Sequence, residues 1–221
     1  MFDVEKEIRD NLRTTLVSNH TAESGTTTTN IKITAHGLDN GTNIINTSRG
    51  NAKRAITVVD ADNFTVDSVT GQTAGDTIQV LAFKHYYVGQ VDEFPTPYLP
   101  CVVVFGTTST LEQKSTATDR WKFDLNIEVY TNAWANVSES DLPDDILAAQ
   151  RELKDLMEKR QTNGAPETNT ILGVVRKYIL GTNYLYNDNI EITYGKHLIN
   201  NKPYFKASMK LECVTMAHPR T

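Results

Sequence analysis

This 221-residue chain lacks the common motifs of catalysis and cofactor binding, and it contains little cysteine. It has no Gly-x-x-x-x-Gly-Lys, no Gly-x-Gly-x-x-Gly, no His-Glu-x-x-His and no paired Cys-x-x-Cys, and its five histidines stand singly. Two cysteines cannot build a disulfide framework or a cysteine metal cluster. Cys101 and Cys213 lie in apolar strand-like runs, so we predict reduced core residues. The sequence therefore predicts no catalytic, cofactor or metal site, and a protein that is not an enzyme.

An excess of basic residues and a long apolar run are also missing. The formal net charge of −5 argues against tight, non-specific binding of nucleic acid, which needs a basic surface. The longest apolar run, Cys101 to Phe105, is far too short to cross a bilayer. The first residues are acidic and amphipathic, unlike the basic and then apolar layout of a signal peptide. We therefore expect no membrane partner.

Aromatic residues are nearly absent between Thr21 and Ala82, where Phe64 is the only one. Thr, Asn, Gly and Asp crowd this segment, and turn signals separate short β-type runs at 30–34, 42–47, 55–59, 64–67 and 77–81. This pattern predicts that 21–82 is an inserted, small all-β barrel or sandwich. The main domain then comprises 1–20 and 83–221, because insertions are tolerated in surface connections.

One acidic turn in the insert suggests a calcium loop. Asp60-Ala61-Asp62-Asn63 supplies carboxylates, but it lacks the third oxygen ligand, the glycine and the distant glutamate of an EF-hand. A β-turn that uses Asp and Asn for backbone hydrogen bonds is the favoured interpretation.

The main domain is organised around residues 119–160, which read as a strand followed by a helix. Residues 119–130 alternate, and five apolar side chains share one face of the predicted strand: Trp121, Phe123, Leu125, Ile127 and Val129. Residues 140–157 form an amphipathic helix that begins at Ser140-Asp141-Leu142-Pro143. Its acids, Asp141, Asp144 and Asp145, complement the helix dipole rather than form a catalytic pair. A second amphipathic helix, from Asp3 to about Asn19, carries Val4, Ile8, Leu12 and Leu16 on one face.

The remaining segments complete a sheet. Residues 101–105 read as a doubly covered strand, and 106–118 as a long polar loop with the single apolar residue Leu111. Residues 171–180 fit either state: Asn169 as a cap and Gly181 as a stop favour a helix, whereas Gly173 and the paired valines favour a strand. We prefer the helix. A terminal hairpin pairs 189–194 with 204–213 through a connection at 195–203.

Together these elements predict an α+β fold. A mixed or antiparallel sheet is packed by two main amphipathic helices, and it carries the inserted small all-β domain.

Outside the insert, the chain resembles the tail terminator (tail completion) proteins of long-tailed bacteriophages. The resemblance rests on the order of five segments: Leu99-Pro100-Cys101-Val102-Val103-Val104, Arg120 to Tyr130, Asp141 to Met157, Leu172-Gly173-Val174-Val175, and Phe205 to Val214. The insert departs from that pattern. Its segments Ile33 to Leu38 and Asn63 to Val66 are similar to a small β-barrel of phage structural proteins and ubiquitin-activating enzymes, but it contains no cysteine for conjugation chemistry.

The resemblance implies a virion protein of the tail or neck, assembled in the host cytoplasm. It implies a homo-oligomeric ring, usually a hexamer, at the head-proximal end of the tail tube. The ring's partners are the tail tube protein and a neck or connector protein, and genomic DNA passes through it without sequence-specific binding. An acidic or neutral lumen suits that passage.

Other functions remain open at this stage. The chain could form a different neck or tail ring, such as a head–tail joining or tube protein, or be a carbohydrate- or surface-binding module that binds through the insert. Tyr86-Tyr87 and Tyr184-Leu185-Tyr186 could stack bases, although interface tyrosines are the simpler interpretation. For a ring, the candidate partner interface is the 106–118 segment, with Leu111 as the buried anchor and Glu112 and Lys114 as flanking polar contacts.

Overall fold

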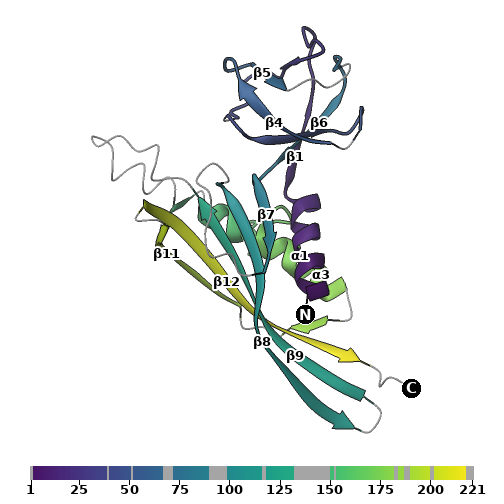
Figure 1. The fold of residues 1–221 in the computed structure, drawn as a ribbon, viewed down its shortest axis with the longest axis vertical. Coiled ribbons are helices and arrows are strands. Elements are labelled where there is room, and N and C mark those ends of the chain that lie inside the picture. Colours follow the sequence, from purple (N-terminus) through teal and green to yellow (C-terminus); the bar gives the residue numbers. More distant parts are fainter. Residues whose placement is uncertain are drawn as a thin grey trace. The chain divides into compact units, whose positions relative to one another are not determined.

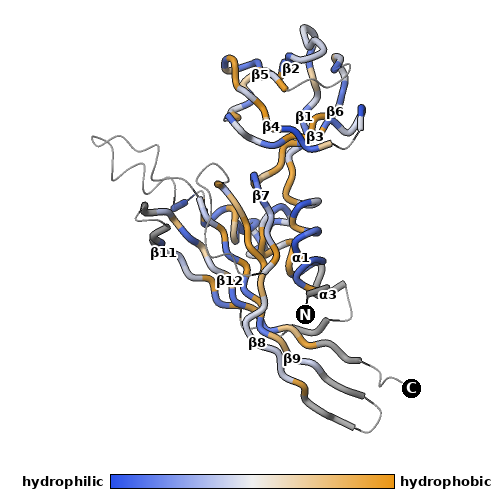
Figure 2. The backbone as a smooth tube through the Cα atoms, viewed as in Figure 1, coloured by the Kyte–Doolittle hydropathy of each residue, from blue (hydrophilic) through white to orange (hydrophobic). Residues whose placement is uncertain are grey.

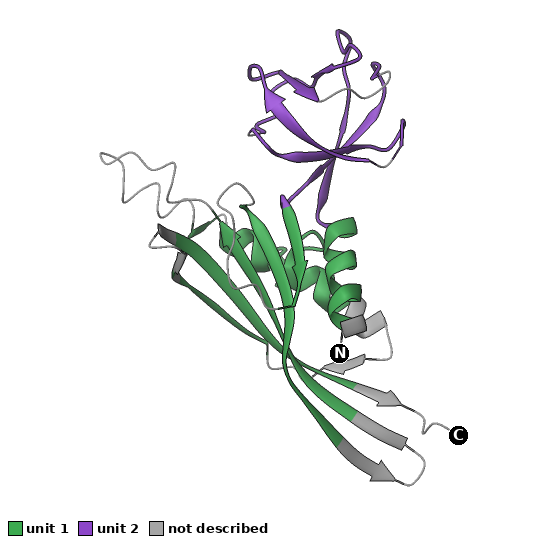
Figure 3. Cartoon of the chain, in the orientation of Figure 1, with its two compact units in different colours: residues 1–15, 85–221 green, residues 16–84 purple. Residues whose placement is uncertain are grey.

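The computed structural model describes residues 2–38, 40–50, 52–66, 72–89, 99–115, 118–131, 150–151, 153–181, 184–186, 190–199 and 202–217 (Figure 1). The chain divides into two compact units, Met1–Thr15 with His85–Thr221 (unit 1) and Leu16–Lys84 (unit 2), coloured separately in Figure 3. Helix α1 (Phe2–Thr15) ends before the predicted Asn19, because Val17–Thr21 forms strand β1 of unit 2.

The predicted α+β fold is wrong. The structure is mostly β, with 49% strand and 18% helix, and its described residues form two sheets and three short helices. The two segments that were predicted to be connections, 106–118 and 195–203, lie largely within long strands. Of the predicted helix at 140–157, residues up to 149 lie outside the described part, and residues 150–151 and 153–158 are helical.

Unit 2 is a six-stranded sheet in the order β1-β6-β3-β4-β5-β2. Its strands after β1 are β2 (Asn30–Lys32), β3 (Asn43–Asn46), β4 (Lys53–Val58), β5 (Asn63–Val66) and β6 (Thr77–Leu81). Every pairing in it is antiparallel. The sheet encloses one apolar core, made of Ala22, Ile31, Ile33, Ile44, Ile56, Phe64, Val66, Ile78 and Val80. Short strands with turn-forming residues between them can close such a core because each strand contributes only one or two inward side chains.

Unit 1 is built on a second six-stranded sheet. Its path is β10-β12-β9-β8-β7, and β11 also pairs with β12. The strands are β7 (His85–Val88), β8 (Cys101–Ser115), β9 (Thr118–Thr131), β10 (Tyr184–Tyr186), β11 (Glu191–Ile199) and β12 (Lys202–Ala217). β7 and β8 are parallel, and the other pairs are antiparallel. The Val-rich start of β8, beside β7, is hydrophobic in Figure 2 and fully buried.

The two faces of this sheet differ in composition. Face A is apolar and buried over the central strands, where it carries Val102, Val104, Phe123, Leu125, Ile127, Val129, Ala207, Met209, Leu211 and Cys213. Face B combines a small apolar cluster, which includes Cys101, Val103, Tyr130 and Tyr204, with charged residues farther along β9 and β12. The predicted alternation of residues 119–130 therefore identifies the core face correctly.

Helices α1 and α3 (Ile171–Gly181) contact each other, and α1 also contacts β7 and β8. The helix at 171–180 is confirmed, but its cap is Thr170 rather than Asn169: the Thr170 hydroxyl accepts the Gly173 amide at 3.0 Å.

Gly173 also has a packing role. A Cβ at that position would lie 2.0 Å from the backbone oxygen of Glu167. The glycine that favoured a strand in the sequence is thus needed for a close backbone approach.

Candidate functional site

Most of the predicted loop at 106–118 is strand: residues 106–115 belong to β8 and pair with β9. β8 continues to Ser115 and β9 begins at Thr118, so the ladder extends to the pair Ser115↔Thr118. β12 continues alongside β9 as far as the pair Ala217↔Asp119. We call residues 106–115, 118–125 and 211–217 the arm. Residues 107–111 of β8 are exposed, and Thr suits an exposed strand, so this stretch folds as a strand without apolar alternation.

The base of the arm is anchored by a buried carboxylate. The register of β8 shifts between Gly106 and Thr108, which marks a β-bulge. At this bulge the Gly106 amide donates a hydrogen bond of 2.6 Å to Oε1 of Glu5, a residue of α1 that is only 3% exposed. A carboxylate acceptor gives a strong, short hydrogen bond, so α1 holds the point at which β8 leaves the body of the sheet.

Two large apolar side chains are exposed on the arm. Leu111 of β8 lies directly opposite Trp121 of β9, and these side chains are 48% and 39% exposed. Both belong to face A, where burial decreases along β9 from Leu125 at 0% through Phe123 at 4% to Trp121. Leu111 was predicted as the anchor of an interface, and in the isolated chain it has the exposure such an anchor needs.

The polar candidates lie beside this pair. In the backbone register Glu112 is opposite Arg120, and Lys114 sits at the second register shift, between Gln113 and Ser115. The side chains of Glu112 and Lys114 lie outside the described part. Trp121 was missed as an interface residue, because its alternation with Phe123 and Leu125 suggested burial. Reading 106–115 as a strand would have placed it opposite Leu111.

Polar pairs stabilise the other face of the sheet. Thr108 donates a hydrogen bond of 2.6 Å to Asp124, and Lys122 forms an ion pair of 2.6 Å with Glu212. Nearer the body, Glu128 is 9% exposed. It accepts the Tyr130 hydroxyl at 2.6 Å and pairs with the Lys206 ammonium at 2.5 Å. Burial, together with the hydrogen bond to Glu128, raises the pKa of Tyr130 well above its usual range, so this hydroxyl stays protonated and serves packing.

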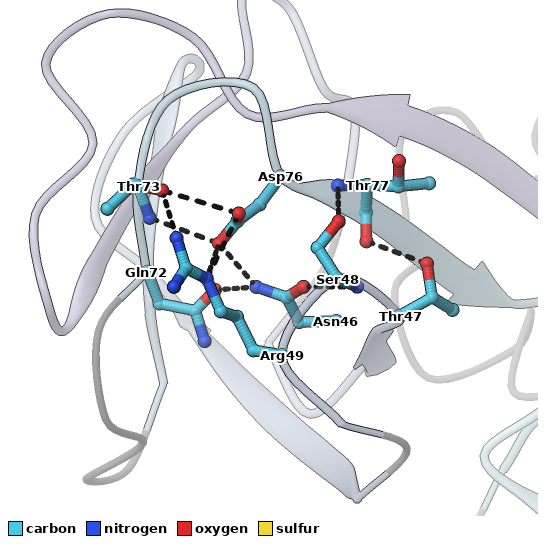
Figure 4. A network of polar contacts seen from close by, with 8 residues as sticks. All are labelled: Asn46, Thr47, Ser48, Arg49, Gln72, Thr73, Asp76 and Thr77. Atoms are coloured by element: carbon cyan, nitrogen blue, oxygen red, sulfur yellow. Dashed lines mark hydrogen bonds and ion pairs between the residues drawn. The ribbon is translucent and has the colours of Figure 1, made fainter.

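Unit 2 contains a buried polar network around Asp76 (Figure 4). Arg49 Nε donates to both carboxylate oxygens of Asp76 at 3.0 and 3.1 Å, and the Asn46 amide and the Thr73 backbone N–H donate to it at 3.0 and 3.1 Å. Burial alone would raise the pKa of Asp76, but these donors together lower it to about 2. Every donor belongs to the same unit, so the network joins the β3 turn to the β6 turn and is structural.

The acidic turn at Asp60 is a hydrogen-bonded turn. Asp60 accepts the backbone N–H of Asp62 at 2.8 Å and the Asn63 amide at 2.9 Å, which lowers its pKa. Asp62 in turn accepts the Ala35 N–H at 2.8 Å. Both carboxylates are therefore engaged by the chain itself. Among the described residues, no group of three or more His, Cys, Asp or Glu could hold a metal ion.

The thiols are buried and unreactive. Cys101 lies on face B and Cys213 on face A, each with 0% exposure and no disulfide. Burial raises the pKa of both thiols to about 12, so neither is a nucleophile at neutral pH. In the described part of the chain, the exposed Leu111–Trp121 pair on the arm is the candidate interaction surface.

None of the helices in the described part is both long and apolar enough to cross a membrane. Neither the models of known protein families nor the curated proteins include a match to this chain.

Proposed function

We propose that this chain is a structural virion protein: a tail terminator that forms a ring at the head-proximal end of a phage tail tube. It ends tube polymerisation and joins the tail to the neck. The observation that carries the proposal is the exposed Leu111–Trp121 pair on an arm of three paired strands. The chain's resemblance to the terminator family supplies the identity of the partners.

Exposed apolar pairs of this size favour a partner. Removing apolar area from water contributes about 25 cal/mol per Å², and aromatic anchors dominate many interfaces. A paired arm is also ordered before it meets its target, so its binding loses less conformational entropy than the docking of a flexible loop. The arm therefore suits contact with a tube subunit or a neighbouring ring subunit.

Charge is compatible with DNA passage. The chain has a formal net charge of −5, and a ring with that balance does not hold phosphates electrostatically. Such a ring would end the tube through shape complementarity. One face of the ring binds the last ring of the tube, and the opposite face does not bind a further tube subunit.

The test is an arm variant in assembling particles. Leu111, Glu112 and Lys114 are replaced together by Ser, and Trp121→Ser is made separately. The matched control is Val59→Ser, which removes an apolar side chain that is 60% exposed in unit 2. We expect both arm variants to give overlong tubes or tails without heads in electron micrographs, and the control to give normal particles. Normal tail length and infectivity from both arm variants would rule out the arm as the functional surface.

A further inference from the structure

Both edges of the unit 1 sheet carry a stretch of strand with no pairing partner among the described residues. β7 pairs with β8 only over residues 101–104, so β8 has an unpaired outer edge from about 106 to 115. At the opposite edge, the nine residues of β11 pair on one side with β12 and with no described strand on the other. Unpaired edges of this length are templates for adding another strand.

The directions of the two edges are compatible. β8 is antiparallel to β9, β9 to β12, and β12 to β11, so β8 and β11 run in opposite directions. A second copy in the same orientation can place its β11 beside the β8 edge, so that the two sheets become one continuous sheet. The new strand pair is then antiparallel. Antiparallel pairing places hydrogen bonds perpendicular to the strands.

The hydrogen-bonding groups of the two edges also alternate in a way that permits this pairing. Val104 accepts the Gly89 amide at 2.9 Å and Gly106 donates to Glu5, so residues 104 and 106 direct their backbone N–H and C=O groups away from β9. After the bulge at 106–108 the alternation directs Ser109 and Leu111 outward. On β12, the same alternation directs the backbone groups of Ala207 toward β9. Tyr194 of β11 lies opposite Ala207, so its backbone groups point outward, away from β12. Leu111 and Tyr194 both belong to face A, as directly paired residues must.

The exposed apolar residues follow the same arrangement. Among the described side chains of unit 1, the large apolar ones that are exposed are Leu111, Trp121 and Tyr194, and all three lie on face A. Leu111 and Tyr194 belong to the edge strands β8 and β11, and Trp121 lies on β9 directly opposite Leu111. Pairing β8 with β11 of another copy places the partner's Tyr194 beside Leu111, whose neighbour on the other side is Trp121. Aromatic and aliphatic neighbours across strands stabilise such a pair.

We propose that the lateral contact between copies of this chain is a β-strand addition: the β8 edge of one copy, 106–115, pairs with β11 of the next. This contact is heterologous, because two different surfaces meet, and with a rotation it closes into a ring. The strand addition would be the contact between neighbouring subunits of the proposed ring, so this inference rests on the proposed function. A contact between two β8 edges would leave each Tyr194 exposed and β11 unpaired.

Cross-linking between two variants tests the pairing. Leu111→Cys and a mass-tagged Tyr194→Cys are purified separately, mixed at high concentration and treated with a short bismaleimide. The native Cys101 and Cys213 are buried, so the bismaleimide should not react with them in the folded protein. We expect a mixed cross-linked species in the mixture and little cross-linking in either variant alone. Homodimers of Leu111→Cys would show a β8–β8 contact and overturn the proposal, as would a wild-type chain that stays monomeric up to its solubility limit.

A backbone variant tests the same pairing without changing an apolar side chain. Ser109→Pro removes an outward amide that makes no ladder bond to β9, so the monomer should keep its fold by circular dichroism. We expect self-association to weaken about tenfold or more, since one edge hydrogen bond and the local strand geometry are lost, and Ser109→Ala to associate normally. Unchanged association of a folded Ser109→Pro protein would overturn the proposal. An oligomer without the mixed cross-link overturns the strand pairing and leaves the terminator function standing. A mixed cross-link together with normal tails from both arm variants leaves the strand pairing standing and rules out the arm as the surface that ends the tail tube.

Discussion

The backbone N–H of Gly106 donates a 2.6 Å hydrogen bond to the buried carboxylate of Glu5, which links the first helix to the strand that becomes the arm. The Gly106 amide lies at a bulge, beyond the last pair of β7 with β8, so its other hydrogen-bonding options are few.

We expect Glu5→Ala to lower the free energy of unfolding by about 1–3 kcal/mol, because it leaves that amide without its acceptor. Glu5→Gln keeps an oxygen acceptor and should cost less. Urea unfolding followed by circular dichroism measures both variants. Equal losses for the two would show that the charge, rather than the acceptor, holds the arm base.

Gly173 should not tolerate a side chain. A Cβ there would meet the Glu167 oxygen at 2.0 Å, and this oxygen belongs to backbone rather than to a flexible side chain. We expect Gly173→Ala to cost about 1–3 kcal/mol of stability by overpacking, although alanine is the better helix former. Gly195→Ala is the matched control, since nothing lies within 4 Å of its Cβ position. A thermal melt of the two proteins decides the point, and a Gly173→Ala variant as stable as the control would contradict it.

The Asp76 network should make unit 2 sensitive to acid. The folded-state pKa of Asp76 is about 2 and its ordinary value is 3.8, so the carboxylate stabilises the fold above about pH 4. That contribution is lost as the pH falls toward 2, and we expect it to amount to about 1–2 kcal/mol.

The measurement for Asp76 is the pH dependence of unfolding in the wild type and in Asp76→Asn. The variant should be less stable at pH 7, and the difference between the two proteins should shrink between pH 4 and pH 2. A difference that stays constant over this range would show that Asp76 does not titrate with folding.

The two thiols should report on opening of unit 1. Both are fully buried with pKa values raised to about 12, so a thiol reagent should label neither in the native protein at pH 8. Both should react in urea, at the rate of unfolding. Because Cys101 and Cys213 lie on opposite faces of the sheet, mass spectrometry of partly labelled protein distinguishes global unfolding from exposure of one face. Rapid labelling of either thiol in native buffer would contradict its burial.

Unit 1 should fold without unit 2. The core of unit 2 draws only on residues from Ala22 to Val80, and the chain enters and leaves the unit at neighbouring points, where Leu16 accepts the Ala82 amide at 3.1 Å. Replacing 16–84 by a short Gly-Ser bridge should leave a protein that melts cooperatively, as scanning calorimetry would show. An insoluble product, with the intact chain soluble under the same conditions, would mean that unit 2 belongs to the folding core.

Local patterns in the sequence were enough to predict several elements. The alternation of residues 119–130 identified face A, because side chains alternate across any strand whatever its partners. The short β-type runs between turn signals anticipated the five strands β2 to β6 to within a few residues, since turn chemistry is local. Burial of Cys101 and Cys213 followed from their apolar neighbours.

Tertiary structure decided what composition could not. Residues 106–115, which are mostly polar, and 195–199, which lie between two alternating segments, were interpreted as connections. Long-range pairing with β9 and β12 makes them strands, so the fold is mainly β rather than α+β. In the sequence Gly173 favoured a strand, but in the structure it lies in a helix where the backbone oxygen of Glu167 leaves no room for a side chain. The candidate site divides in the same way. Leu111 stood out in the sequence as the only apolar residue of a polar segment, but its partner Trp121 became visible only through the cross-strand register, because contacts between distant segments are set by the folded chain and not by local pattern.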